Sequence, residues 1–289
     1  MLPKETLTTL DSAALRPKRV VSGTVLNAYL PAMNYKAPLS TGSWVSLFHP
    51  SIIEVMSRAG FDWLVVDMEH SVIDFMQAQI MIATIQAQGL QAYVRVGENN
   101  RRIIKRVLDA GADGIIVPMV NSYEEAVEAV EAVKYPPVGQ RGVGLARAQG
   151  YGVGDGFATY RDGKAKEIKL IAQIEHHQAI DELDGIIGLD GIDGTLIGPY
   201  DLSGSMGKPG QYEDDDVIAA LRRYEIVANA NPHKLMGFHV VDLRPEAFRD
   251  KVDKGYNFIA YGIDALFLGE ACRTQLAAIR AKIANDRPL

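Results

Sequence analysis

Residues 59–67 read AGFDWLVVD and residues 110–117 read AGADGIIV, and this repeated phrase decides the fold. In each copy a helical pattern ends at Ala-Gly, and a short hydrophobic run begins shortly afterwards. Glycine ends a helix readily because it adopts the left-handed conformation at low cost. The hydrophobic runs are nearly continuous, as expected for parallel strands that are buried on both faces. Lys254-Gly255-Tyr256-Asn257 has the same form. The phrase therefore predicts the helix-to-strand junctions of a parallel α/β protein.

The same alternation of apolar run and helical pattern extends outward from residue 43 to the C-terminus. Strands and helices in regular alternation are typical of parallel βαβ units. Helical patterns cover residues 51–59, 74–88, 101–110 and 122–133, and Ser122 with Glu125 has the spacing of a capping box. The predicted strands are Ser43–Leu47, Phe61–Asp67, Gln91–Val96, Asp113–Val117, Leu170–Ile174, Ile192–Ile197, Leu235–Val240 and Phe258–Tyr261.

Eight such strands close most simply into a (β/α)8 TIM barrel. We predict an N-terminal extension over residues 1–40 and a barrel over residues 41–289. The competing fold is an open doubly wound sheet, which would need a G-x-G-x-x-G turn after a strand. Gly142-Val143-Gly144 lies instead in a predicted loop and lacks the third glycine. That loop spans residues 134–168, and a loop of this length in a compact domain is usually functional.

Composition excludes several classes of function. The chain has 289 residues, of which 47% are hydrophobic and 23% charged, and this balance suits one soluble globular domain. A formal net charge of −6 without basic clusters argues against nucleic-acid binding. No apolar run reaches the roughly 18 residues that a membrane span needs. Polar residues interrupt the weak signal-like pattern at residues 16–33, so we interpret that segment as part of the extension.

The chain contains one cysteine, Cys272. It cannot form an internal disulfide or a cysteine-based metal site. Its place in the apolar pattern of the last helix predicts that it packs there. A single cysteine fits a reducing compartment, and we expect a cytoplasmic protein.

Polar side chains gather where the predicted strands end. In (β/α)8 barrels the catalytic groups lie at the C-terminal ends of the strands. Chance would make one or two of these ends polar, whereas the second, third, fifth and sixth strands all carry polar groups. The residues at these four ends are Asp67, Glu69, His70, Arg95, Gln173, Glu175, Pro199, Tyr200 and Asp201. The sequence therefore predicts an active site at this end of the barrel.

Glu175 and Asp201 are the candidate metal ligands. Burying an unpaired carboxylate is costly, so Glu175 needs a cation or a buried arginine. Asp201 is a ligand or the cap of a helix that begins at Leu202-Ser203. Two carboxylates at neighbouring strand ends, without cysteine or paired histidine, suit a hard cation such as Mg²⁺ or Mn²⁺.

His70 and Arg95 are candidates for proton transfer and for binding an anion. Asp67 and Glu69 are near enough to orient His70 and raise its basicity, and the alternative is a hydrogen-bonded core histidine. Arg95 is a charge on an otherwise buried strand, so it needs a partner. A substrate carboxylate held by two guanidinium nitrogens is one solution. A structural ion pair with Asp67 or Glu69 is the other.

Schiff-base catalysis would need a desolvated lysine at a strand end. None of the predicted strand ends carries one, and this favours a metal over a lysine. His176, His177 and His239 are interpreted as supporting or packing residues.

Five motifs occur in order between about Thr41 and the C-terminus. They are Gly60-Phe61-Asp62-Trp63-Leu64 with Asp67-Met68-Glu69-His70, Leu108-Asp109-Ala110-Gly111-Ala112, residues 135–142 (YPPVGQRG), Gln173-Ile174-Glu175, and Gly198-Pro199-Tyr200-Asp201-Leu202-Ser203. Together they resemble the HpcH/HpaI aldolase/citrate lyase family of metal-dependent pyruvate aldolases. That family includes 2-dehydro-3-deoxyglucarate aldolase and 4-hydroxy-2-oxo-heptane-1,7-dioate aldolase, and macrophomate synthase is a relative.

The resemblance implies a role for each residue that matches a motif. Glu175 and Asp201 would hold the metal. Arg95 would bind the pyruvate carboxylate. His70 and Asp67 would form an acid–base pair that acts through a metal-bound water.

It also implies binding residues and an assembly. Gln173, Pro199 and Tyr200 would lie near the oxo acid, with the N–H groups of Tyr200 and Asp201 facing its carboxylate. Asp109 would support the histidine of a neighbouring subunit. The eighth helix would be exchanged between subunits, in dimers that assemble into a homo-hexamer.

The implied reaction joins pyruvate to an aldehyde, or cleaves a 4-hydroxy-2-oxo acid, through a metal-stabilised enolate. Mg²⁺ or Mn²⁺ would serve, with Co²⁺ as a further candidate. The alternative reaction forms the same enolate by decarboxylating oxaloacetate, as a macrophomate-synthase-like enzyme would. A non-catalytic barrel that binds a 2-oxo acid is disfavoured, because it has no need of His70. Tyr200 and His176-His177 depart from the family pattern and leave the second substrate open.

Overall fold

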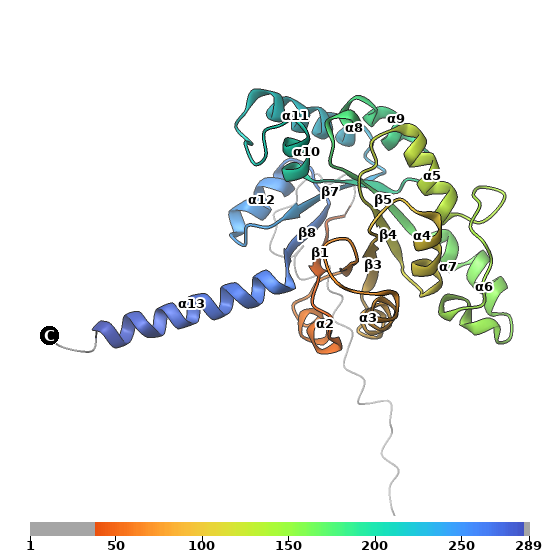
Figure 1. Ribbon diagram of the computed structural model, residues 1–289, viewed down its shortest axis with the longest axis horizontal. Coiled ribbons are helices and arrows are strands. Elements are labelled where there is room, and N and C mark those ends of the chain that lie inside the picture. Colours follow the sequence, from red (N-terminus) through yellow and green to blue (C-terminus); the bar gives the residue numbers. More distant parts are fainter. Residues whose placement is uncertain (1–37, 286–289) are drawn as a thin grey trace, which may run out of the picture.

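The computed structural model describes residues 38–285, in which parallel strands close into a barrel in the order of the sequence (Figure 1). The predicted (β/α)8 fold is confirmed. The strands are β1 Ser40–Val45, β2 Trp63–Asp67, β3 Gln91–Arg95, β4 Gly114–Val117, β5 Lys169–Ile174, β6 Gly194–Ile197, β7 Leu235–Val240 and β8 Phe258–Ile263. Most of the predicted extension over residues 1–40 lies outside the described residues.

Helices surround the barrel (Figure 1). Among the described residues they are α2 Pro50–Ser57, α3 Phe75–Ala87, α4 Arg101–Asp109, α5 Tyr123–Val133, η2 Arg147–Gly152, α6 Gly156–Asp162, α7 Lys164–Glu167, α8 His177–Asp181, α9 Leu183–Gly188, α10 Pro199–Ser205, α11 Asp215–Ala230, α12 Pro245–Asp253 and α13 Asp264–Asn285. In that part of the chain no helix is long and apolar enough to cross a membrane.

The first strand begins earlier than predicted, at Ser40 in place of Ser43. Its first residues pair with β8, where Ser40 lies opposite Phe258. These residues are polar or small, so their hydrophobicity gave no sign of a strand. The second strand begins later than predicted, at Trp63.

The predicted helix-to-strand junctions are confirmed. Gly60, Gly111 and Gly255 have φ angles of 92°, 105° and 94°, the left-handed region that glycine tolerates. The predicted capping box is only half formed. The Ser122 hydroxyl accepts from the Glu125 N–H, but the Glu125 carboxylate accepts from the N–H of residue 121 in place of that of Ser122.

The barrel interior is filled by side chains from alternate positions of the strands. This inner cluster consists of Trp44, Trp63, Val65, Tyr93, Ile116, Ile171, Leu196, Phe258 and Ala260. Trp63 stacks on Phe258 with 4.1 Å between ring centroids, and Gly42 leaves room for the indole, since a Cβ there would lie 2.0 Å from it. Successive side chains of a strand point to opposite faces. The inward positions therefore continue, at the C-terminal ends, to Asp67, Arg95, Gln173 and His239.

The segment predicted as a long loop contains the short helices η2, α6 and α7. Arg141 fixes it to the barrel. This arginine is 1% exposed, and it donates to Asp109 and to the Tyr160 hydroxyl, each at 3.0 Å. The segment is thus packed structure against the end of α4.

Helix α13 extends away from the barrel (Figure 1). The carboxylate of Asp264 fixes its first turn by accepting from the N–H groups of Ser46 and Leu47, at 3.0 and 2.8 Å. Farther along, the helix exposes Leu268, Leu276, Ile279 and Ile283. Cys272 is also exposed, so the prediction that it packs is wrong within one chain. The apolar pattern was read correctly as a helix, but that helix leaves its own barrel.

Candidate active site

Arg95 and Asp67 form a buried ion pair between neighbouring strands. The Nε and Nη2 groups of Arg95 donate to the two oxygens of Asp67, at 3.0 and 2.7 Å, and Nη1 lies 3.1 Å from Glu69 Oε2. Asp67 is 2% exposed. The guanidinium carbon also lies 4.3 Å from the centroid of the Trp44 ring. Of the two alternatives for Arg95, the structural ion pair is therefore present in the single chain.

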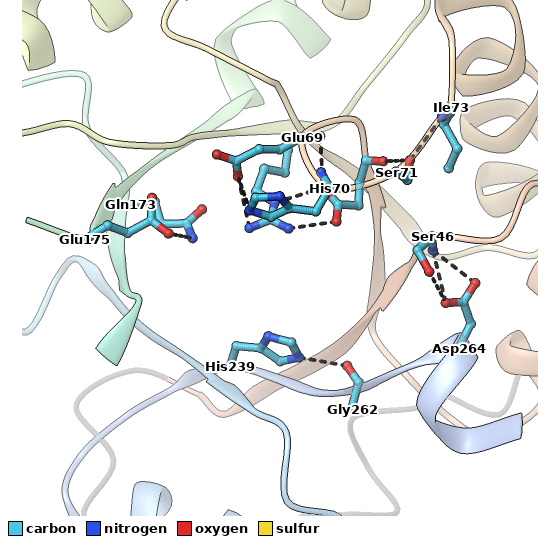
Figure 2. Close-up of polar contacts among 12 residues, drawn as sticks. Ser46, Glu69, His70, Ser71, Ile73, Gln173, Glu175, His239, Gly262 and Asp264 are labelled. Atoms are coloured by element: carbon cyan, nitrogen blue, oxygen red, sulfur yellow. Dashed lines mark hydrogen bonds and ion pairs between the residues drawn. The ribbon is translucent and has the colours of Figure 1, made fainter. Parts of the chain in front are cut away.

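His70 lies at the barrel mouth, beside Glu69 (Figure 2). Its side chain is 70% exposed, which excludes the alternative of a core histidine. The ring Nε2 is 3.8 Å from Glu69 Oε2. Asp67 accepts instead from the backbone N–H groups of Glu69 and His70, at 3.1 and 3.3 Å. Asp67 thus shapes the turn that carries the histidine, and Glu69 is the carboxylate nearest to the imidazole.

Glu175 is held in a fixed position after β5. Its Oε1 accepts from Gln173 Nε2 at 2.6 Å, and its Oε2 accepts from the Met119 N–H at 3.1 Å. Met119 has a φ angle of 52°, which is strained for a residue with a side chain. A Cβ on Gly198 would lie 2.8 Å from Glu175 Cγ, so the end of β6 must be glycine for this carboxylate to fit.

The pKa of the Glu175 carboxylate lies above its ordinary value. Burial raises its pKa to about 7, and the negative charges of Glu69 and Asp201 add to that rise. The Met119 N–H and the Arg95 charge oppose it. Burial also raises the pKa of Glu69, with Asp67 and Asp201 contributing. Charges that interact in this way lie close together, so the site gathers negative charge.

Asp201 lies in the first turn of α10, where it does not act as the helix cap. The N-cap residue is Gly198, and no side chain caps that end. The capping alternative from the sequence is therefore not observed. Tyr200, next to it, is 61% exposed at the mouth. Pro199 is the first residue of the helix, and the N–H groups of Tyr200 and Asp201 have no acceptor within it, as in any first turn.

These residues fit a divalent cation. Glu175 and Asp201 are oxygen donors whose charges repel each other, and a cation would relieve that repulsion. Gln173 Oε1 is buried without a hydrogen-bond partner. Within residues 38–285, no three His, Cys, Asp or Glu side chains already form a metal-binding group. Two protein carboxylates, completed by water and substrate oxygens, are the arrangement that Mg²⁺ commonly uses.

Asp109 is the one predicted site residue that the structure does not bring to the others within one chain. It ends α4, which returns to the N-terminal side of the barrel. Its Oδ1 accepts from Arg141 and from Gln149, each at 3.0 Å. Within the chain its contacts are those of the packed segment after α5.

Two residues at the site, Trp44 and Met119, were not predicted from the sequence, and a third, His239, was interpreted only as a supporting or packing residue. The alternation of inward positions along β1 and β7 would have indicated Trp44 and His239, because each is two residues beyond an inward glycine (Gly42 and Gly237). Met119 acts through its backbone, so its side-chain type carried no signal.

The chain matches a family model and named enzymes over most of its length. The model described as HpcH/HpaI aldolase/citrate lyase matches residues 40–271. The hydroxypyruvate/pyruvate aldolase of Roseovarius nubinhibens is 36% identical over 262 residues, which are 86% of this chain and 98% of the relative. The 2-keto-3-deoxy-L-rhamnonate aldolase of Klebsiella pneumoniae is 35% identical over 248 residues, 85% of this chain and 91% of the relative.

Solved structures have the same barrel. A HpcH/HpaI aldolase/citrate lyase family protein from Burkholderia cenocepacia has a TM-score of 0.79 at 30% identity, covering 86% of this chain and 96% of that one. Macrophomate synthase has a TM-score of 0.76 at 21% identity, covering 92% and 90%, and shares the fold. The barrel and its aldolase relatives define a carbon–carbon lyase. The chain belongs to the HpcH/HpaI aldolase/citrate lyase family, as the motifs predicted, and it is an aldolase.

Proposed function

We propose that this aldolase depends on a divalent metal and joins pyruvate to an aldehyde, or cleaves a 4-hydroxy-2-oxo acid into these two products. The observation that carries the proposal is the gathering of carboxylates around Glu175, whose pKa burial raises to about 7. A cation bound by Glu175 and Asp201 supplies a Lewis acid that stabilises the enolate of the oxo acid. Mg²⁺ or Mn²⁺ is proposed, with Co²⁺ as a further candidate.

The chain's own groups bind the oxo acid and move its proton. The Arg95 guanidinium, fixed in its plane by Asp67, faces the substrate carboxylate with its charge. We place Gln173, Pro199 and the N–H groups of Tyr200 and Asp201 in the same region, where these N–H groups would donate to the carboxylate. The exposed His70 imidazole takes and returns the proton, and Glu69, 3.8 Å away, stabilises the imidazolium.

Metal removal tests the proposal. Treatment with EDTA should abolish aldol turnover, and Mn²⁺, Mg²⁺ or Co²⁺ should restore it. The reason is that the enolate oxygen would have no metal ion to balance its negative charge. Borohydride added with pyruvate should leave the mass of the protein unchanged in intact-mass spectrometry. A pyruvate adduct on a lysine would contradict the proposal, since it would demonstrate a Schiff base.

We propose further that the functional unit is a homo-hexamer, a trimer of dimers in which the two chains of each dimer exchange α13. The support is the apolar face that this helix exposes, since a helix alone in water is stabilised little by its own hydrogen bonds. In that assembly Asp109 would support His70 of a neighbouring subunit. The substrates are small molecules, pyruvate or oxaloacetate with an aldehyde, and the proposed location is the cytoplasm.

Charging the exposed face of α13 should dissociate the oligomer. L276E combined with I279E would place two carboxylates against apolar surface, where their burial is costly. Sedimentation should then give the 31.6 kDa of one chain, whereas Q275E, a change at a neighbouring polar position, should keep the larger mass. A wild-type mass of one chain would contradict the oligomer.

A further inference from the structure

His239 lies at an inward position of β7, on the opposite side of the barrel from Arg95. Leu235, Gly237 and His239 alternate along β7 as Tyr93 and Arg95 do along β3. In a closed ring of eight strands, β3 and β7 are four places apart and face each other. Figure 2 shows His239 across from His70 and Glu69. Its ring centroid is 5.4 Å from that of Trp44.

The tautomer of His239 follows from its one hydrogen bond. Nε2 lies 3.0 Å from the carbonyl oxygen of Gly262. A carbonyl only accepts, so Nε2 carries the hydrogen. Burial, helped by the Arg95 charge and opposed by the Gly262 carbonyl and Asp67, lowers the pKa of this imidazole to about 4. At neutral pH the ring is therefore uncharged, and Nδ1 is a bare acceptor.

Nδ1 has no hydrogen-bond partner among residues 38–285, and it is not one of the unpartnered atoms sealed from solvent. A histidine that served only to fill the core would normally satisfy both ring nitrogens. The neighbouring indole Nε1–H of Trp44 is buried and also has no partner. The structure thus leaves one acceptor and one donor unused on this side of the barrel.

Pyruvate cannot satisfy that acceptor. Ionised pyruvate has a keto oxygen and a carboxylate, which accept hydrogen bonds and donate none. A simple aldehyde has no donor either. A hydroxyl group both donates and accepts, so it complements the free Nδ1 and matches the chemistry of the unused indole N–H.

We propose that His239 binds a substrate hydroxyl on the carbon next to a carbonyl, and that it thereby makes the enzyme prefer hydroxylated substrates to their deoxy analogues. This rests on the proposed aldol reaction. The hydroxyl can belong to the aldehyde or to the oxo acid, as in glycolaldehyde or hydroxypyruvate. His239 acts here as a binding residue that selects the substrate, since a base so weak would not take the reacting proton.

The test measures kcat/KM for each pairing of pyruvate or hydroxypyruvate with acetaldehyde or glycolaldehyde. Wild-type enzyme should prefer the hydroxylated member for one of the two substrates by about tenfold or more, the scale of one hydrogen bond to a substrate hydroxyl. H239L, which keeps the bulk but has no acceptor, should lose that preference. H239N, which places an amide oxygen near the position of Nδ1, should keep part of it.

His233→Leu is the matched control, because it removes an exposed imidazole just before the same strand. It should leave the preference unchanged. The proposal is overturned if H239L lowers all four pairings by one common factor, or if the wild type prefers neither hydroxylated substrate. A wild type inactive with all four pairings would overturn the proposed aldol reaction itself. The substrate whose preference disappears in H239L identifies where the hydroxyl lies.

Discussion

Glu175→Ala and Asp201→Ala are each expected to lose bound metal and to lower aldol turnover by roughly a thousandfold or more, since Lewis-acid stabilisation supplies several kcal/mol. Either change leaves a single carboxylate, which is too few to hold a well-hydrated cation against water. Metal content by mass spectrometry and kcat/KM with added Mn²⁺ measure the two effects. E182A, which removes an exposed carboxylate from the turn between α8 and α9, is the control and should retain both.

The pH dependence of the free energy of unfolding tests the same site without an activity measurement. Because burial raises the pKa of Glu175 to about 7, the folded metal-free protein binds a proton more tightly there than the unfolded chain does. Its free energy of unfolding should therefore fall as the pH rises from about 4.5, the ordinary value, to about 7. E175Q should show a smaller loss, which comes from Glu69, whose pKa burial also raises. Urea unfolding in EDTA at pH 5 and pH 8 measures the difference. Full activity in D201A would contradict the metal site, and the same pH profile in E175Q as in the wild type would contradict the raised pKa of Glu175.

Arg95→Met is expected to lower the free energy of unfolding by about 3–5 kcal/mol, the range for removing one member of a buried ion pair. It would leave Asp67, whose side chain is 3% exposed, with an uncompensated charge. Urea unfolding measures the loss. R101M removes an exposed pair with Glu131 and should cost less than about 1 kcal/mol.

A second change separates charge from packing. D67N combined with R95M removes the buried negative charge, so it should recover part of the stability that R95M loses. The double variant should remain inactive, because it lacks the guanidinium that we propose binds the substrate carboxylate. If R95M costs no more than R101M, the buried pair does not stabilise the barrel.

The sequence predicted the barrel and most of the strand-end residues because both depend on local periodicity. Near-continuous apolar runs identified the strands, and the position of Glu175 directly after such a run made it a candidate ligand. The partner of Arg95 was left open, since a sequence gives no distance between neighbouring strands. In the structure, register places Arg95 opposite Asp67.

Other features depend on contacts between distant parts of the chain, and the periodicity of the sequence does not indicate these. The apolar pattern around Cys272 was correct, but it did not reveal that α13 leaves its own barrel. Asp109 was predicted as a site residue from the motif resemblance. Within one chain it pairs with Arg141 and does not lie with the other site residues. His239 was interpreted as a supporting or packing residue, because the free nitrogen that distinguishes it follows from a hydrogen bond to a carbonyl of the next strand.

Asp264 has a consequence for anyone who wishes to re-engineer this barrel as a smaller catalyst. Its carboxylate joins the N-terminal end of α13 to the loop after β1, more than two hundred positions away along the chain. Phe267, one turn farther, still packs on the barrel core. A shortened design should therefore keep at least the first turn of the helix. A cut before Asp264 would free Ser46 and Leu47, and with them the rim next to Trp44.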